Sequence, residues 1–170
     1  IQPRTFYGIA KYASERLLWK VTAKQPQTTL ALLRPPLIYG MGDKSMGYGP
    51  TGFINRLLKD EEIVLWGDAT ELREFLYVKD IAHIVYEVVR NNFSGVLNPV
   101  NGKSYSFQQL LDQISAITGK PPKITRRERT NEKVDNVFSN ELLRKTFPFF
   151  RFTTLDMGIH DMLESGNFGK

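Results

Sequence analysis

A tyrosine and a lysine near the start of the chain are spaced for proton transfer. Tyr7 and Lys11 lie four residues apart, and side chains at this spacing share one face of a helix. A free phenol has a pKa of about 10, too high for easy proton exchange at neutral pH, but a neighbouring ammonium favours the phenolate. The pair is therefore a candidate acid/base unit. Taken alone, the spacing favours a surface pair without a catalytic role, because many helices carry it by chance.

The hydrophobic pattern places Tyr7 and Lys11 on a long helix. Apolar residues recur at helical spacing between Phe6 and Lys24, and Gln25-Pro26 ends the segment because proline disfavours helical backbone in the residue before it. The apolar stripe consists of Ile9, Tyr12, Ala13, Leu17 and Val21. The near-continuous apolar run at 28–34 then predicts a strand buried on both faces, as in a parallel sheet.

Helices alternate with short strands along the rest of the chain, which is typical of α/β proteins. Strands are expected at 37–39, 63–66, 75–78 and 96–100, and helices at 53–59, 80–91, 106–118, 140–146 and 155–163. The helix at 106–118 has the best-defined ends, because Ser106 and Gln109 have the capping-box spacing and Gly119 suits the position after the last turn. The glycine-rich stretch 40–52 is expected to be a long loop of the kind that often carries binding residues.

The composition is that of an ordinary globular protein and excludes several kinds of site. The chain has 170 residues, of which 41% are hydrophobic, and this is enough for one core-forming domain. The absence of cysteine excludes a disulfide framework and a thiolate zinc site, and the two histidines, His83 and His160, argue against a metal centre. No apolar run approaches the roughly 18 residues of a membrane span. The net charge of +5 suits a nucleotide or a nucleic acid as well as a mildly basic surface.

Three motifs in a fixed order resemble the extended short-chain dehydrogenase/reductases, the NAD-dependent epimerase/dehydratase family. The stretch YGIAK at 7–11 resembles the Tyr-x-x-x-Lys motif of this family, and LRPPLIYG at 33–40 and WGD at 66–68 with REFLYVKD at 73–80 follow in the family's order. The resemblance implies the C-terminal part of a Rossmann-like doubly wound sheet plus the small α/β substrate-binding domain. Residues 1–40 would end the Rossmann-like domain, and 41–170 would form mainly the substrate-binding domain, with about 75–100 returning to the sheet.

The resemblance also implies a role for each matching residue. Tyr7 would exchange a proton with a sugar hydroxyl or keto oxygen, and Lys11 would hold the ribose hydroxyls of NAD or NADP. Pro35 and Leu37 would line the nicotinamide site. Arg73 matches an arginine that grips the diphosphate of a nucleotide-sugar substrate, a role that suits a guanidinium fork. A structural salt bridge of Arg73, for instance to Asp80, is the alternative.

Other residues of these motifs have both a binding and a structural interpretation. Trp66 stands where several family members contact the nucleotide base, and it equally fits a core aromatic that ends a strand. Tyr39 and Tyr77 look more like packing residues than catalytic ones. The basic cluster comprises Lys120, Lys123, Arg126, Arg127, Arg129 and Lys133. It favours a solvated loop over nucleic-acid binding, because no aromatic residues are interleaved for stacking on bases. One of its arginines could contact a diphosphate, but the sequence does not indicate which.

Departures from the family pattern shape the functional hypothesis. The family's Gly-x-x-Gly-x-x-Gly turn, which cradles the pyrophosphate of the dinucleotide, is absent, and the glycines at 47–52 do not fit it. We therefore expect the C-terminal part of a cytoplasmic nucleotide-sugar epimerase or dehydratase, inactive as this chain alone. Leu37 replaces a common substrate-binding asparagine, and Lys79 replaces an acidic residue. The alternatives are a non-catalytic nucleotide-sugar-binding module and an epimerase-reductase similar to GDP-fucose synthase. Family members commonly dimerise through the Tyr-Lys helix, so a homodimer through that helix is also expected, with neither nucleic acid nor membrane as a partner.

Overall fold

The computed structural model describes residues 3, 5–44, 49–130 and 132–165, and it confirms the α/β fold class. Its helices are α1 (Phe6–Thr22), α2 (Pro50–Leu58), α3 (Val78–Arg90), α4 (Phe107–Thr118), α5 (Glu141–Thr146) and α6 (Leu155–Glu164). Its strands are β1 (Ala31–Leu33), β2 (Leu37–Tyr39), β3 (Glu62–Trp66), β4 (Leu72–Tyr77), β5 (Gly95–Leu97), β6 (Ser104–Ser106) and β7 (Lys123–Arg127). No helix of the described residues is long and apolar enough to cross a lipid bilayer.

Short parallel strand pairs connect distant parts of the sequence. β1 pairs with β5, β2 with β4, and β3 with β7, all in parallel, while β6 joins β4 in the antiparallel sense. The register of the β2–β4 pair sets Leu37 opposite Phe75 and Tyr39 opposite Tyr77. The two prolines before β2, Pro35 and Pro36, therefore lie beside β4, the strand that carries Arg73.

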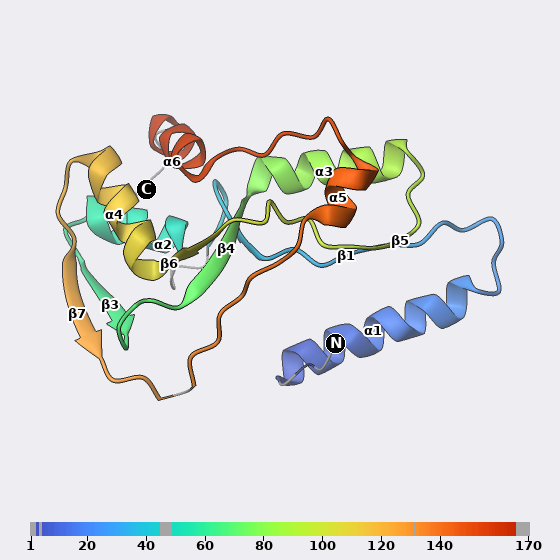
Figure 1. The fold of residues 1–170 in the computed structure, drawn as a ribbon, viewed down its shortest axis with the longest axis horizontal. Coiled ribbons are helices and arrows are strands. Elements are labelled where there is room, and N and C mark those ends of the chain that lie inside the picture. The colour runs from blue at the N-terminus through green and yellow to red at the C-terminus, as the bar shows by residue number, and fades with distance from the viewer. Residues whose placement is uncertain (1–2, 4, 45–48, 131, 166–170) are drawn as a thin grey trace.

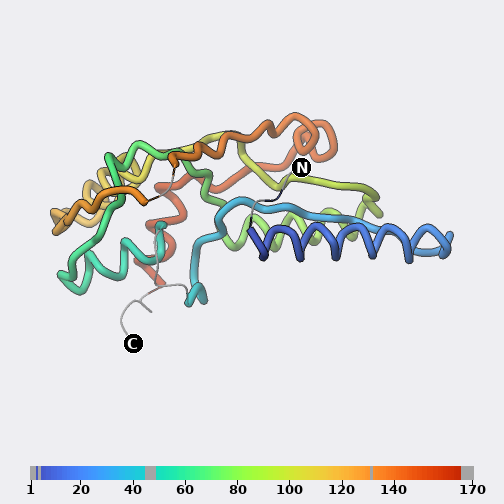
Figure 2. The backbone as a smooth tube through the Cα atoms, turned by 90° about the horizontal axis from the view of Figure 1, so that it is seen from below, coloured from blue at the N-terminus to red at the C-terminus, as the bar shows by residue number. Residues whose placement is uncertain are grey.

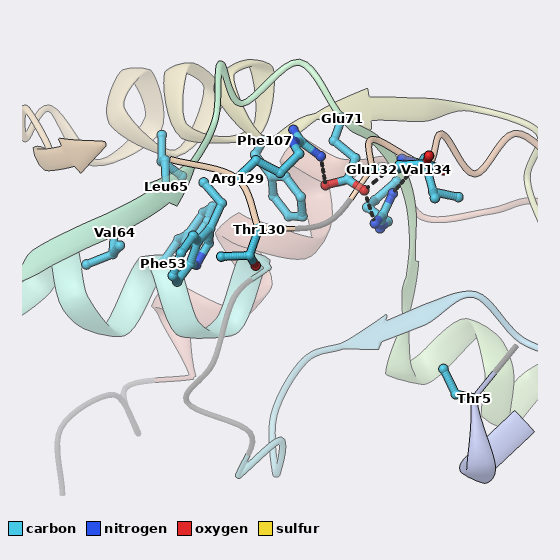
Figure 3. Close-up of a pocket in the computed structure, with 12 residues that line it drawn as sticks. Thr5, Phe53, Val64, Leu65, Glu71, Phe107, Arg129, Thr130, Glu132 and Val134 are labelled. Carbon is cyan, nitrogen blue, oxygen red and sulfur yellow. Dashed lines mark hydrogen bonds and ion pairs between the residues drawn. The ribbon is translucent and has the colours of Figure 1, made fainter. Parts of the chain in front are cut away.

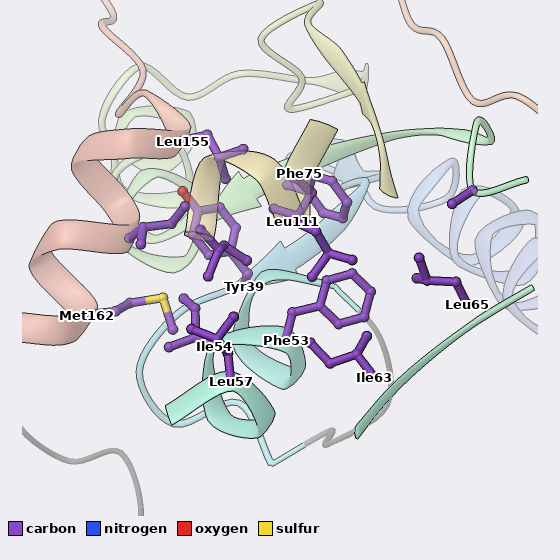
Figure 4. Close-up of a cluster of buried hydrophobic side chains, with 14 of the residues drawn as sticks. Tyr39, Phe53, Ile54, Leu57, Ile63, Leu65, Phe75, Leu111, Leu155 and Met162 are labelled. Atoms are coloured by element: carbon purple, nitrogen blue, oxygen red, sulfur yellow. The ribbon is translucent and has the colours of Figure 1, made fainter. Parts of the chain in front are cut away.

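Two hydrophobic clusters stabilise the two ends of the molecule (Figure 1). The larger one gathers side chains of α2, α4 and α6 against strands β2, β3 and β4 (Figure 4). Its members include Tyr39, Phe53, Phe75, Leu111 and Met162. The smaller one packs α3 and α5 against the β1–β5 pair through Ile84, Leu97 and Leu143. The predicted apolar stripe of α3 thus contributes Ile84 and Val88 to a real core.

Helix α1 forms where the periodicity predicts it, but its apolar stripe is exposed rather than buried. None of its residues is buried or belongs to either cluster, and Figures 1 and 2 show it running alongside the β1–β5 pair. The strand expected at 28–34 is also shorter than predicted, because only Ala31–Leu33 pairs with β5. Of that strand only Leu32 is buried, so the expectation of burial on both faces is wrong for its neighbours within this chain.

The ends of several elements follow local rules that the sequence carries. The Ser106 hydroxyl accepts a hydrogen bond from the Gln109 backbone amide, and the Gln109 side-chain oxygen accepts one from the Ser106 backbone amide, which confirms the capping box of α4. Gly119 follows that helix with a φ of 67°, as expected for its left-handed end. The loop expected through 40–52 ends early, because α2 begins at Pro50, and proline is well suited to a first helical position. Part of the predicted loop, 45–48, lies outside the described residues.

The C-terminal helix α6 packs on β2 through a glycine. Tyr39 and Tyr77 are both 2% exposed, which confirms that they are packing residues, and their ring centroids lie 5.3 Å apart. The Tyr39 hydroxyl is buried without a hydrogen-bond partner among the described residues and lies where a Cβ on Gly158 would be. Burial raises the pKa of Tyr39 above its ordinary value, so this hydroxyl stays neutral. Gly158 is therefore required for the close approach of α6.

Replacing Gly158 with alanine should destabilise the protein through this contact. We expect the Gly158→Ala variant to lose about 1–3 kcal/mol of unfolding free energy, the usual cost of overpacking a core. The measurement is urea denaturation followed by circular dichroism. Adding Tyr39→Phe should recover part of the loss, because it removes the clashing oxygen. Equal losses with and without the Tyr39 hydroxyl would contradict this assignment.

Candidate functional site

Tyr7 and Lys11 share one face of α1, as their spacing predicts. The helix begins at Phe6 because the Thr5 hydroxyl accepts a hydrogen bond from the Gly8 amide at 3.1 Å. Tyr7 is 74% exposed, and the Lys11 Nζ lies 5.5 Å from the centroid of its ring. No carboxylate of the described residues pairs with this ammonium within ion-pair distance. Both side chains are therefore available to a ligand.

The two residues line a cavity of 710 Å³ together with the segment before β2. The predicted cofactor residues Pro35 and Leu37 lie in its wall, so the structure brings all four of these predicted site residues to one cavity. The consecutive prolines 35 and 36 offer no backbone N–H, so this part of the wall is apolar with carbonyl acceptors. The cavity thus combines an apolar wall with a phenol and an ammonium.

Helix α1 is attached beside this cavity by an ion pair that the sequence reasoning missed. The guanidinium of Arg34 binds both carboxylate oxygens of Glu15, with Nε 2.9 Å from Oε1. The hydrogen bonds from Arg34 hold the pKa of Glu15 below its ordinary value. The Arg34 backbone amide also donates to the carbonyl of Leu97 at 3.0 Å, so the same residue connects α1 to the β1–β5 pair. The sequence did single out Arg34, because it belongs to the LRPPLIYG stretch, but it did not indicate its partner Glu15.

Arg73 lies at the junction of two cavities. It lines the cavity of Tyr7 and Lys11 and also an adjoining cavity of 670 Å³ that Trp66 lines (Figure 3). Its side chain is 16% exposed, and it donates hydrogen bonds to Glu71 and to the carbonyl of Val134. The alternative interpretation, a structural salt bridge of Arg73, is confirmed, but its partner is Glu71 and not Asp80. Asp80 instead accepts hydrogen bonds from the amide and hydroxyl of Thr153, at 2.9 and 2.7 Å.

A second arginine faces the same carboxylate in the adjoining cavity. Arg129 Nη1 donates to Glu71 Oε2 at 3.0 Å, while its Nη2 is buried without a hydrogen bond to the described residues and lies 3.7 Å from Asp68 Oδ1. Burial raises the pKa of Glu71, but the hydrogen bond from Arg73, the Val134 amide and the charge of Arg129 bring it below its ordinary value. Two guanidinium groups thus share the ionised carboxylate of Glu71, and Arg129 has Asp68 as a second, more distant ion-pair partner.

Local geometry explains why Arg129, and not another arginine of the basic cluster, reaches this site. The β3–β7 register sets Trp66 opposite Arg127, so Arg129 lies just beyond the turn at Gly67. Gly67 has a φ of 64°, and a Cβ there would lie 3.0 Å from Arg129 Nε. The glycine of the Trp-Gly-Asp stretch therefore makes room for the guanidinium. Trp66 itself is 50% exposed, which excludes a core position within this chain.

The remaining members of the basic cluster mostly contact the protein itself. Lys123 pairs with Asp60, and Lys133 pairs with Asp135 at 3.3 Å. Arg126 donates to the side-chain oxygen of Gln108 at 2.9 Å. Residues 123–127 form strand β7, so the expectation of a solvated loop is wrong for this part of the cluster. Pairing with β3 orders these residues.

Glu74 follows Arg73 on β4 and also lines the cavity of Tyr7 and Lys11. It is 1% exposed, and its Oε1 accepts hydrogen bonds from the amides of Asn101 and Gly102, the latter at 3.1 Å. Its Oε2 is buried without a hydrogen-bond partner among the described residues. Burial raises the pKa of this carboxyl above its ordinary value, although the two amides oppose the shift.

Comparisons with known proteins bear on the family and the fold of this chain. A model of the NAD dependent epimerase/dehydratase family matches residues 1–101. The curated dTDP-4-dehydro-6-deoxy-D-allose reductase of Streptomyces bikiniensis is 27% identical over 124 residues, which cover 69% of this chain and 37% of the relative. A putative UDP-glucose 4-epimerase of Methanocaldococcus jannaschii is 30% identical over 118 residues, with 67% and 37% covered. The matched part therefore spans about 37% of the length of these relatives.

A solved structure matches nearly the whole chain. MoeE5, in complex with UDP-glucuronic acid and NAD, superposes with a TM-score of 0.82 at 25% identity. The match covers 96% of this chain and 56% of that one. It confirms the expected fold, the C-terminal portion of a Rossmann-like enzyme fold.

The buried Glu74 carboxyl should make stability fall as pH rises. Because its pKa is higher in the folded than in the unfolded state, its contribution is fully present below the unfolded value of about 4.3 and is lost as pH rises through the folded value. Glu74→Gln keeps the oxygen that accepts from Asn101 and Gly102 but cannot ionise. We expect the unfolding free energy of Glu74→Gln, relative to that of the native chain, to increase between about pH 4 and pH 7.

Urea denaturation at a series of pH values measures this difference. Glu61→Gln is the matched control, because it removes the same charge from an exposed side chain. Parallel pH profiles for Glu74→Gln and the native chain would contradict the raised pKa.

Proposed function

The chain belongs to the NAD dependent epimerase/dehydratase family, and we propose that it supplies the acid/base pair and substrate cavity of a nucleotide-sugar enzyme. The observation that carries this proposal is the position of Arg73. It lines both the cavity of Tyr7 and Lys11 and the cavity of Trp66 and Arg129. One elongated ligand could therefore reach the phenol with its sugar while its diphosphate lies against the arginines.

The residues of the cavity that Trp66 and Arg129 line fit a diphosphate. Arg129 Nη2 is a buried donor without a hydrogen bond to the described residues, although it lies within ion-pair distance of Asp68, and Arg73 provides a second guanidinium in the same wall. Guanidinium groups bind phosphate oxygens through paired, charge-assisted hydrogen bonds. The half-exposed ring of Trp66 offers a flat surface for the nucleotide base at the far end of the cavity. These features support a nucleotide sugar as the substrate class, and the names of the relatives include dTDP, UDP and GDP sugars.

The residues around Tyr7 fit the nicotinamide end of NAD or NADP. The Lys11 ammonium provides three N–H donors for ribose hydroxyls, and Pro35 and Leu37 provide an apolar wall. When bound, the cofactor would take up or return a hydride. The Tyr7 hydroxyl exchanges the proton at the reacting sugar oxygen, and Lys11 stabilises the phenolate that this exchange requires. MoeE5, which was solved with NAD, supports the same cofactor class.

Three further points belong to this proposal. Residues 1–40, with part of 75–100, act as the end of the Rossmann-like domain, and most of 41–170 forms the substrate-binding domain. Catalysis requires a dinucleotide cradle that these 170 residues do not provide, so the chain alone is inactive.

A homodimer forms through α1, whose apolar residues are exposed; they include Phe6, Ile9, Leu17 and Val21.

Replacing Tyr7 with phenylalanine tests the catalytic assignment in the full-length protein. The variant keeps the ring but loses the proton donor, so turnover of the nucleotide sugar should fall by about 10²–10⁴-fold while its dissociation constant changes little. Tyr12→Phe is the matched control, because it removes a hydroxyl from the same helix outside this cavity. Unchanged turnover in the Tyr7→Phe protein would leave the non-catalytic binding module as the better description.

Replacing Arg129 with glutamine tests the diphosphate site. The dissociation constants of UDP and dTDP, measured by calorimetry, should rise at least about tenfold, because a charge-assisted contact is lost. Arg126→Gln removes the same charge from the neighbouring strand outside the cavity and should leave both constants unchanged. Equal effects of the two substitutions would show that only the overall charge of the surface matters.

A further inference from the structure

A third cavity lies apart from the proposed catalytic site. It has a volume of 760 Å³ and shares no lining residue with either of the two cavities described above. Its walls come from the residues around β6, from α5, and from the segment 148–155 that leads from α5 into α6 (Figure 1). The volume is within the range of small-molecule sites.

Three positively charged side chains from three separate elements line this cavity. They are Lys103 before β6, Arg144 on α5 and Arg151 on the segment that follows, and no aspartate or glutamate lines it. None of the three pairs with a carboxylate of the described residues within ion-pair distance. Arg151 donates only to the carbonyls of Pro148 and Phe150, both at 3.3 Å. Converging cations without a counterion raise the local positive potential and favour an anionic ligand.

The acidic residues nearby lie behind the wall, where Glu74 accepts hydrogen bonds from the amides of Asn101 and Gly102, and none of them lines the cavity. Asp80 is 6% exposed and accepts both of its hydrogen bonds from Thr153, which lies in the cavity wall. Burial raises the pKa of Asp80, and the two hydrogen bonds from Thr153 oppose the shift. Asp156 lies on the first turn of α6, outside the wall. The hydrogen bond with Tyr105, supported by the charge of Asp156, raises the pKa of Lys103 and keeps its ammonium charged.

The wall is preformed, and it contains the start of a helix. The Thr154 hydroxyl caps α6 by accepting a hydrogen bond from the Met157 amide at 3.3 Å, and Thr154 and Leu155 both line the cavity. The positive end of the helix dipole therefore adds to the three side-chain charges. The Thr153 contacts with Asp80 fix the segment that enters the helix. Tyr105 and Phe152 add aromatic surface beside these charges.

We propose that this cavity binds a small phosphorylated ligand with two or more phosphate groups. Three cations on different walls suit a ligand whose charge is spread over several oxygens rather than a single monovalent anion. The site is independent of the proposed function, because none of its residues takes part there.

Inorganic pyrophosphate is the probe, added to the isotopically labelled chain at constant ionic strength and followed by amide resonances. Saturable shifts are expected at Gly102, Lys103 and Thr154. Arg144→Gln should raise the dissociation constant of pyrophosphate at these resonances at least about tenfold. Lys145→Gln, which removes a charge from the adjacent position of α5 outside the cavity, should leave it unchanged.

The same titration separates this site from the diphosphate site of the proposed function. Pyrophosphate bound there would shift Thr130 and Val134 and would weaken in Arg129→Gln, whereas the Gly102 and Thr154 responses would not. Three outcomes would overturn the inference: no saturable shift at Gly102 and Thr154, equal effects of Arg144→Gln and Lys145→Gln, or shifts reproduced by sodium sulfate at matched ionic strength. A stronger response to an acidic peptide than to pyrophosphate would also overturn it, in favour of a protein partner.

Discussion

The parallel register of β2 against β4 is the constraint on which the candidate site depends. It sets Leu37 opposite Phe75, and it thereby brings the apolar wall of one cavity beside Arg73 and Glu74. The same register stacks Tyr39 against Tyr77 and directs both into the core beneath α6. A shift of one residue would turn every side chain of β4 to the opposite face. Arg73 would then leave the junction of the cavities, and Glu74 would lose its amides.

One carboxylate organises the arginines of the proposed substrate cavity. Glu71 contacts the guanidinium groups of both Arg73 and Arg129, and Asp68 is a more distant second partner of Arg129. Removing charged groups from water is costly unless each finds a partner, and Arg129 Nη2 makes no hydrogen bond to the described residues. In the proposed complex, a phosphate oxygen would be the acceptor for this donor. Glu71 positions both arginines for that contact.

The sequence predicts what local patterns determine and misses what distant contacts decide. The capping box of α4, the extent of α1 and the shared face of Tyr7 and Lys11 depend on residues within a few positions, and each was predictable. Arg129, one of the two arginines that contact Glu71, lies 58 residues farther along the chain. This contact depends on the β3–β7 register and on the space beside Gly67. Strand β6 has three residues, too few for a periodic signal. The exposure of α1 was unpredictable for another reason, since an amphipathic pattern does not say which surface covers it.

That exposed helix limits how firmly the chain alone can hold Tyr7. The ion pair between Arg34 and Glu15 is partly exposed, and such pairs contribute only about 0–1 kcal/mol. Helix α1 buries no side chain, although most helical stability in proteins comes from packing an apolar face. The exposed residues Phe6, Leu17 and Val21 would lose water in the homodimer proposed above, at about 25 cal/mol per Å² of apolar area. Burial of this face, rather than the ion pair, would then be what fixes the phenol of Tyr7 in position for proton transfer.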